Sequence, residues 1–482
     1  MLLKFRGDEV KCCLVIDISK VNLKIMSLTL REDKIFMQEI HRCSKIITKS
    51  KDYKLSLNVD KIVNEIKESL ISFKQIGYDI ESISINSSIN EMVLLDENNN
   101  LVKDILIDTQ GKSIYLNRII NELGMAYIYR KTGISFNPNN FIYKLMMYKD
   151  SYEEEFKNVR KIVSVSDYIN YRLTGKLFNE RTQLSLTQYF NFKNQTIDED
   201  ILDYLDVKDI LEFNLIDYGK EIGSCLNFNC PIISPYGNNL LSSFLVTDVS
   251  NKNSIFIVNS YDGIIGCTED FSKMYLEGAK HDLNHQLFNE SLVKIFKYIP
   301  CYRLVDEFLK NVDNNYMVEN VWRVINENRE IEYIIDFDSD IFKNSASLIN
   351  LIKYYFEFRI NSMPNSISNF TKIVYDSFAV YYKKFIKDLE KITGGIFDKV
   401  CMVGDYSVNN SYNQFVSDVI LKDLEVGPKD SGIIGNGINQ FIALGKISNI
   451  NEAYELLKNS YTYKAIKYSG KKINYKYLES IV

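Results

Sequence analysis

Pro231-Ile-Ile-Ser-Pro-Tyr-Gly-Asn-Asn-Leu-Leu-Ser-Ser243 is the stretch around which the rest of this chain is organised. An apolar, strand-like run ends at a Pro-x-Gly corner, and a helix-like run follows. Asn238 and Asn239 are therefore expected where a strand turns into a helix, a position that active-site groups of α/β proteins favour. A little further along, a second β-rich run, Ser254–Val258, leads into the turn Asn259–Gly263. The two corners are expected to face one cleft at a domain boundary near the middle of the chain.

Length and composition indicate a globular protein of more than one domain. The 482 residues are too many for one ordinary core, and 46% hydrophobic with 25% charged residues is typical of a folded, soluble chain. With a formal charge of -5, the chain has no excess of basic residues of the kind that nucleic-acid-binding proteins carry. The N-terminus has no apolar core of a signal peptide and no run is long enough to span a membrane, so a cytoplasmic protein is expected. Glycine, at 21 residues, is sparse for a protein that holds phosphates in glycine-rich loops.

Cysteine and histidine give no pattern of a metal centre. The eight cysteines are dispersed and include no C-x-x-C pair, as expected of buried, reduced thiols. His281 and His285 have the i, i+4 spacing of two ligands on one helix face, but no neighbouring Glu gives the H-E-x-x-H form. Two solvated side chains are expected instead.

The first third of the chain predicts a meander, a helix and a further strand. Hydrophobic patterning gives strands at 11–18, 24–30 and 34–40, an amphipathic helix at 59–76, a strand at 83–85 and a hairpin around 96–100. This order is the opening of a ribonuclease H-like, or actin-like, nucleotide-binding half.

Helical patterning dominates from 115 to 195, and an α/β alternation closes the chain. One helix is expected to end at the C-cap Gly175, and the polar segment 179–194 could line a pocket. The longest helix is expected at 369–393, where Tyr and Phe residues make one apolar stripe closed by Gly394-Gly395. Mixed helical patterning is seen at 291–330 and 345–360, and strands or helices are expected in turn at 399–404, 413–421, 424–426 and 432–445.

Taken together, these segments resemble the FGGY carbohydrate kinases, and among them the rhamnulokinase branch. The correspondence runs from about residue 10 to 460, and its most specific matches are Glu39–Arg42, Tyr129–Pro138, Asp167–Lys176 with Thr187-Gln188 after it, and Gly427–Asn436. The resemblance implies an α/β fold with two ribonuclease H-like (actin-like ATPase) domains around a hinged cleft. The expected division is 1–247 for the sugar side and 248–482 for the nucleotide side.

The resemblance also implies transfer of the γ-phosphoryl group of Mg-ATP to a sugar hydroxyl, with an Asp as general base. The base position is matched by Asn239, whose amide can accept a hydrogen bond but cannot take up a proton at neutral pH. Asn239 could instead cap the corner. On the sugar side, Asn238 and the run Asn86–Glu91 match sugar-contacting positions of the family, and Asn90 and Glu91 are the candidates there.

The first phosphate hairpin of the family matches Asp17–Lys24. Asp17 would orient hydrated Mg²⁺, although it could equally be a turn residue. Ser19 and Leu23 stand where glycine would allow a close approach of the backbone to phosphate. Lys20 and Lys24 could attract phosphate as point charges, or simply be solvated.

Two further nucleotide elements match segments in the second half. The second phosphate element matches Asn259–Tyr261, in which the bulky phenol of Tyr261 replaces the family's small hydroxyl donor, and Ser260 and Tyr261 are the phosphate-binding candidates. Near the adenosine site, the family's glycine run matches Gly404-Asp405-Tyr406. A carboxylate at Asp405 would repel nucleotide phosphates by roughly 4 kcal/mol at a few ångströms and an effective dielectric near 20.

These substitutions predict a rhamnulokinase-like pseudokinase, with weak or lost phosphorylation and a sugar-binding or regulatory role. One alternative is an active kinase that uses Mg-ATP to phosphorylate L-rhamnulose or a related ketose. A second alternative is an actin-like scaffold or interaction protein. A monomer or homodimer is expected, with no nucleic-acid or membrane partner.

Overall fold

The computed structural model describes residues 10–50, 53–107, 113–226, 228–299, 305, 329–338, 354, 356–357 and 367–475. The chain divides into two compact units. The first contains residues 1–249, 270–294 and 432–461, and the second contains 250–269, 295–431 and 462–482. The units are thus interleaved along the sequence, and the expected division at 247/248 stays a prediction.

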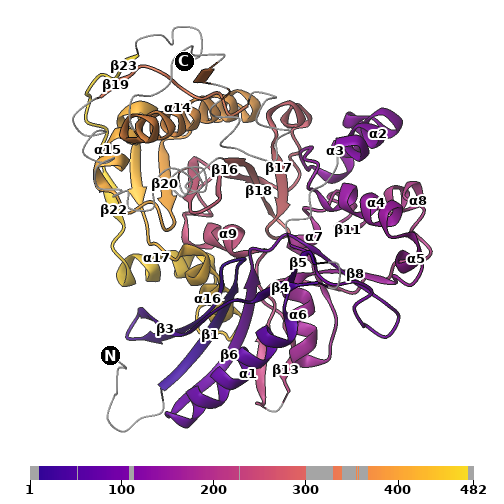
Figure 1. Cartoon of the computed structure of the whole chain (residues 1–482). Helices are drawn as coiled ribbons and strands as arrows, with labels where there is room; N and C mark the ends of the chain where they lie inside the picture. The colour runs from indigo at the N-terminus through magenta and orange to yellow at the C-terminus, as the bar shows by residue number, and fades with distance from the viewer. Residues whose placement is uncertain are drawn as a thin grey trace. The chain divides into compact units, whose positions relative to one another are not determined.

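The first unit is built on a six-stranded sheet with the order β13-β14-β6-β1-β2-β3 (Figure 1). Strands β1 to β3 pair antiparallel, whereas β6 pairs parallel with both β1 and β14. The predicted meander and the strand that follows it are confirmed. The bounds are β1 Val10–Ile18, β2 Asn22–Arg31, β3 Lys34–Ser44, β6 Tyr78–Ser87, β13 Glu221–Cys225 and β14 Cys230–Ile233.

Helix α1, Val59–Gln75, connects the meander to β6, and its sequence explains both its ends and its packing. Asn58 caps it, since its side chain accepts a hydrogen bond from the Lys61 N–H. The predicted apolar positions are buried against the sheet: Ile62, Val63, Ile66, Leu70 and Phe73. Gly77, with φ +91°, lies just beyond the helix, where a side chain would be strained.

The remainder of the first unit consists of short helices and strands, as the helical patterning predicts. Helix α6 ends at Gly175, which adopts the left-handed conformation as expected. The bounds are β4 Ile47–Lys49, β5 Leu55–Leu57, β7 Met92–Leu95, α2 Ser113–Leu123, α3 Met125–Thr132, α4 Phe141–Ser151, α5 Glu153–Phe156, β8 Lys161–Ser164, α6 Val165–Thr174, β9 Asn179–Glu180, α7 Arg181–Leu184, β10 Phe190–Asn191, β11 Thr196–Ile197, α8 Glu199–Tyr204, β12 Leu215–Ile216, α9 Asn239–Ser242 and η1 Ser243–Val246.

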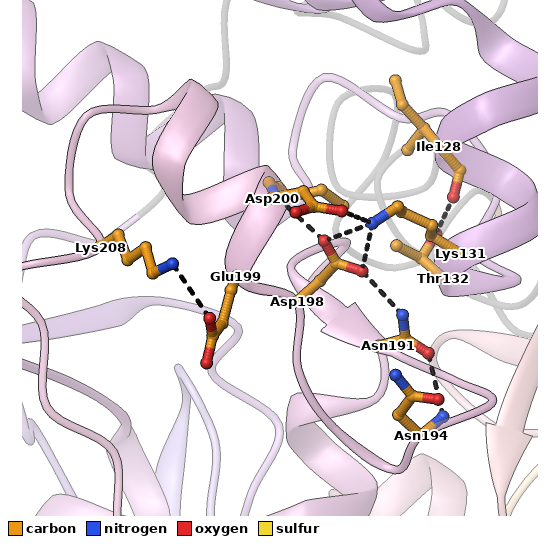
Figure 2. A network of polar contacts seen from close by, with 10 residues as sticks. Ile128, Lys131, Thr132, Asn191, Asn194, Asp198, Glu199, Asp200 and Lys208 are labelled. Atoms are coloured by element: carbon orange, nitrogen blue, oxygen red, sulfur yellow. Dashed lines mark hydrogen bonds and ion pairs between the residues drawn. The ribbon is translucent and has the colours of Figure 1, made fainter.

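An ion-pair network joins α3 to the segment around α8 (Figure 2). Lys131 Nζ lies 2.9 Å from Asp198 Oδ1 and 2.5 Å from Asp200 Oδ2, and Asn191 Nδ2 donates to Asp198 Oδ2. Asp198 also caps α8 by accepting from Ile201 N–H. Each donor has an acceptor, so this cluster stabilises the helical region rather than offering an open site.

A second large sheet has the order β17-β18-β16-β15-β20-β21-β22, with β15, β20 and β21 parallel. The predicted long helix is confirmed as α14. The mixed regions expected at 291–330 and 345–360 lie largely outside the described residues. The bounds are β15 Ser254–Asn259, β16 Gly263–Asp270, η2 Leu276–His281, β17 Asn284–Leu287, β18 Leu292–Ile299, β19 Glu330–Ile331, α14 Ile367–Thr393, β20 Lys399–Val403, α15 Asn410–Ile420, β21 Asp423–Val426, α16 Ser431–Ala443, α17 Ile450–Ser460, β22 Lys464–Ile466 and β23 Asn474–Tyr475.

Helix α16 is distant in sequence from β6, but the two are in contact in the first unit (Figure 1, where α16 is dark yellow and β6 indigo). Ser82 Oγ donates to Gln440 Oε1, and Ser84 Oγ donates to Asn436 Oδ1. These buried bonds satisfy polar groups on the face of β6 that α16 covers, so the helix and the strand hold each other in register.

The prediction of two solvated histidines is wrong for His285. His285 is fully buried in β17, whereas His281 ends η2, so they do not share one helix face. Burial lowers the pKa of His285 to about 4. Among the described residues, no cluster of three or more His, Cys, Asp or Glu side chains is placed to hold a metal ion. The seven cysteines in the described part are free and buried, as expected.

Within the described ranges, no helix combines the length and the apolar character that crossing a membrane requires.

Candidate functional site

The predicted corner is present at the end of β14, where a strand turns into the short helix α9. Gly237 has φ +57°, which glycine adopts without strain. Asn238 is the N-cap, since its Oδ1 accepts from Leu241 N–H at 3.0 Å. Asn239 is the first residue of the helix, so the capping role considered for Asn239 belongs to its neighbour Asn238.

The side chain of Asn239 lies against the first turn of α16. A Cβ atom at Gly432 would be 1.5 Å from Asn239 Oδ1 and 2.2 Å from Asn239 O. One turn later, a Cβ at Gly435 would be 2.0 Å from Ser242 O. The glycines of the 427–436 motif therefore allow α16 to approach α9 closely, and only glycine fits at these two positions.

Polar side chains gather at the carboxyl ends of the neighbouring strands β1, β6 and β14. Asp17 lies opposite Asn86 in the parallel register, and both are buried. Asn86 Nδ2 donates to Ser242 Oγ at 2.9 Å, and that hydroxyl lies 2.9 Å from Asn238 O. Asp17 therefore lies beside Asn86 at the end of β6, and hydrogen bonds of Ser242 connect Asn86 to the corner.

The expected sugar-side acid, Glu91, is buried in an ion pair. Lys144 Nζ in α4 lies 2.9 Å from Glu91 Oε2 and 3.0 Å from Asn90 O, and both charged side chains are 4% exposed. Asn90 itself is exposed. The lysine was not identified from the sequence, because a single Lys within a helical pattern gives no sign of burial. A sugar that reached Glu91 would therefore meet a carboxylate that is already paired with a positive charge.

The first phosphate hairpin is closed by its own serine. Ser19 Oγ accepts from Val21 N–H at 3.3 Å and from Asn22 N–H at 3.2 Å, and it donates to Asn22 O at 3.0 Å. A phosphate nest needs such turn N–H groups directed at the anion. Lys20 is exposed, and Lys24 lies opposite Asp17 in the strand pairing.

In the second unit, the two expected nucleotide loops lie against each other. Tyr406 N–H donates to Asn259 O at 3.0 Å. A Cβ at Gly404, which has φ +111°, would lie 2.6 Å from Asn259 O and 2.7 Å from Ser260 Oγ. Tyr261 is 43% exposed at the β15–β16 turn. Asp405 Oδ1 accepts from Asp430 N–H at 2.8 Å, so its carboxylate is held by the neighbouring loop.

Sequence reasoning did not find a buried carboxyl that supports the corner. Glu180 is fully buried and accepts from Thr182 Oγ1 at 2.6 Å and from the Thr182 and Gln183 N–H groups at 2.8 Å each. Thr182 Oγ1 in turn accepts from Gly237 N–H at 2.9 Å. Burial raises the pKa of Glu180 to about 8 and that of Asp167, whose Oδ2 accepts from Glu180 N–H, to about 7. The polar composition of 179–194 was the only sequence signal for this network.

Comparisons with known proteins agree that this chain is similar to carbohydrate kinases. Residues 12–228 match the N-terminal domain of the FGGY family of carbohydrate kinases. A rhamnulokinase from Oceanobacillus iheyensis is 26% identical over 471 residues, which cover 95% of this chain and 100% of that protein. A rhamnulokinase from Bacillus subtilis is 24% identical, with 93% of this chain and 94% of that protein covered.

Solved structures share the fold along nearly the whole chain. Gluconate kinase from Lactobacillus acidophilus has a TM-score of 0.76 at 16% identity, covering 95% of this chain and 93% of that one. Plasmodium falciparum glycerol kinase with ADP has a TM-score of 0.76 at 13% identity, covering 96% and 95%. The expected α/β fold with two ribonuclease H-like domains is confirmed by these likenesses. This chain therefore resembles the FGGY carbohydrate kinases in its N-terminal half and is similar over its length to rhamnulokinases.

Proposed function

We propose that this rhamnulokinase-like protein has weak or lost ATP-dependent phosphorylation and acts as a sugar-binding or regulatory member of its family. The single observation that carries the proposal is the closed hairpin after β1. The Ser19 hydroxyl already satisfies the Val21 and Asn22 N–H groups, which a phosphate-binding turn would direct at its ligand. Mg-ATP is the cofactor that the family uses, and this turn does not fit its phosphates.

The corner supports the same proposal by its chemistry. Asn239 stands at the position of the family's general base, and an amide does not take up a proton at neutral pH. Loss of general-base assistance typically costs about 100- to 10,000-fold in rate. The amide oxygen of Asn239 lies against Gly432, where an added Cβ would be 1.5 Å away.

The proposal is tested by incubating the purified protein with L-rhamnulose and Mg-ATP and measuring sugar phosphate. No product above background is expected for the natural sequence. The variant Asn239→Asp should gain turnover, because aspartate restores a proton acceptor at nearly the same volume. The double variant Asn239→Asp with Ser19→Gly should gain more, because it also frees the two turn N–H groups.

The matched control is Asn58→Asp, which adds the same charge at the N-cap of α1 and preserves a capping side chain there. It should leave the background unchanged. Efficient turnover by the natural sequence would overturn the proposal, and so would equal gains at 58 and 239.

The second candidate function is an active kinase of altered sugar specificity. It is favoured by Asp17, the residue expected to orient Mg²⁺, which is retained near the carboxyl end of β1. This candidate predicts that Mg-ATP raises the thermal midpoint, because a ligand at 100 times its Kd stabilises by about 2.7 kcal/mol. Millimolar Mg-ATP without any shift would remove it.

A further inference from the structure

We propose that Glu180 is a positioning residue for the corner that holds Asn238 and Asn239, acting through the Thr182 hydroxyl. The inference rests on the proposed function only where it concerns sugar binding. Its geometric part concerns the backbone of Gly237 and stands on the first unit alone, which contains every residue of the network.

The Thr182 hydroxyl has one proton, and the two contacts it makes determine where that proton lies. The 2.6 Å contact to Glu180 Oε2 takes the proton, since a carboxyl oxygen is the stronger acceptor. The lone pairs of Thr182 Oγ1 are then available to the Gly237 N–H at 2.9 Å. The donor direction therefore runs from Gly237 through Thr182 to Glu180.

The network has no alternative partner for the Gly237 N–H among its own members. Gln286 of β17 also contacts the corner and Thr182. Its Nε2 donates to Thr182 O at 3.2 Å, and Tyr236 OH donates to its Oε1 at 3.5 Å. All of these groups are buried, so water does not replace a lost bond cheaply. Because Gly237 immediately precedes the N-cap Asn238, its orientation sets where α9 begins.

The shape-preserving variant Glu180→Gln should disturb this chain of bonds. Once ionised, above its pKa of about 8, the carboxyl accepts from three donors through two oxygens, whereas an amide nitrogen at either position faces a donor. Thr182→Val removes the hydroxyl at similar volume, and Thr182→Ser retains it. Thr187→Val is the matched control, because the buried Thr187 hydroxyl bonds Leu184 O and the side chain of Tyr189, neither of which belongs to this network.

The test is residue-resolved hydrogen exchange of the Gly237 amide, together with calorimetric titration of L-rhamnulose. Thr182→Val and Glu180→Gln should each speed Gly237 exchange by about tenfold or more, as loss of a buried hydrogen bond predicts. Thr182→Ser and Thr187→Val should leave it within about threefold of the natural sequence. Sugar affinity should fall in the first two variants and remain in the last two.

Unchanged Gly237 exchange in both Thr182→Val and Glu180→Gln would overturn the inference. Equal acceleration in Thr187→Val would do the same, since that result would indicate general loosening. If Thr182→Val does not fold, Glu180→Gln decides the question by the same readout. Failure of the natural protein to bind L-rhamnulose would count against the proposed function, while the exchange result would still decide the role of Glu180.

Discussion

Two glycines on the same buried helix should differ in how much stability they lose on the same substitution. Gly435 and Gly437 both lie inside α16, so Gly→Ala gains about 0.8–1.0 kcal/mol of helix propensity at either position. The surroundings differ. A Cβ at Gly435 would be 2.0 Å from the backbone oxygen of Ser242, whereas a Cβ at Gly437 would be 2.3 Å from Leu28 Cδ2, the end of a flexible side chain.

The expected magnitudes follow from what must move. At 435 the backbone of α9 must retreat by about 1 Å or more to restore an ordinary contact, and such overpacking costs about 1–3 kcal/mol. Most of that range exceeds the propensity gain, so Gly435→Ala should lower the free energy of unfolding by up to about 2 kcal/mol. At 437 a rotation of Leu28 relieves the contact, so Gly437→Ala should be within about 0.5 kcal/mol of neutral.

The assay is urea unfolding followed by far-UV circular dichroism, with the midpoints of the two variants compared at an unchanged m-value. Gly395→Ala is the control outside α16, since its Cβ would meet nothing closer than 3.3 Å. The reasoning is refuted if Gly435→Ala is as stable as Gly437→Ala, because the close approach of α16 to α9 would then not constrain position 435.

Three further predictions concern buried groups. Lys144→Met should destabilise the protein by about 3–5 kcal/mol, because it removes the positive charge that lies beside the buried carboxylate of Glu91, and the double variant with Glu91→Leu should recover most of that loss in urea unfolding. A double variant no better than the single one would contradict this. Burial raises the pKa of Glu180 to about 8 and that of Asp167 to about 7, so the folded state retains protons that the unfolded state releases. The thermal midpoint should therefore fall as pH rises from about 5 to 8, and the fall should be shallower in Glu180→Gln. Gly404→Ala should lower the unfolding midpoint of the second unit, since its φ of +111° and the 2.6 Å approach to a backbone oxygen both disfavour a side chain, and an unchanged midpoint would count against the close contact of the two loops.

Local patterning in the sequence predicted the elements whose residues decide their own conformation. The apolar spacing of α1, the aromatic stripe of α14 and the glycine that ends α6 each lie within one segment, so neighbouring residues are sufficient to specify them. The strand-to-helix corner at 231–243 was predicted for the same reason, because Pro and Gly restrict the backbone locally.

Local sequence patterns could not predict the burial and the partners of the candidate site residues. Glu91 was expected to face a sugar, and only the folded chain shows that Lys144, 53 residues away, neutralises it. His285 was expected in solvent, and tertiary packing buries it beside Tyr129 and Gly133. Burial of a single polar residue depends on what covers it, and no periodic pattern in its own segment reports that.

The sequence by itself determined the resemblance to FGGY carbohydrate kinases, the order of strands and helices, and the amide side chain at position 239, because these are properties of residue identity and short-range spacing. The tertiary structure decided that the glycines of α16 contact α9, and that Glu180 reaches the corner through Thr182. Such contacts depend on distances between segments far apart in the chain, and those distances exist only once the sheet and its covering helices have packed.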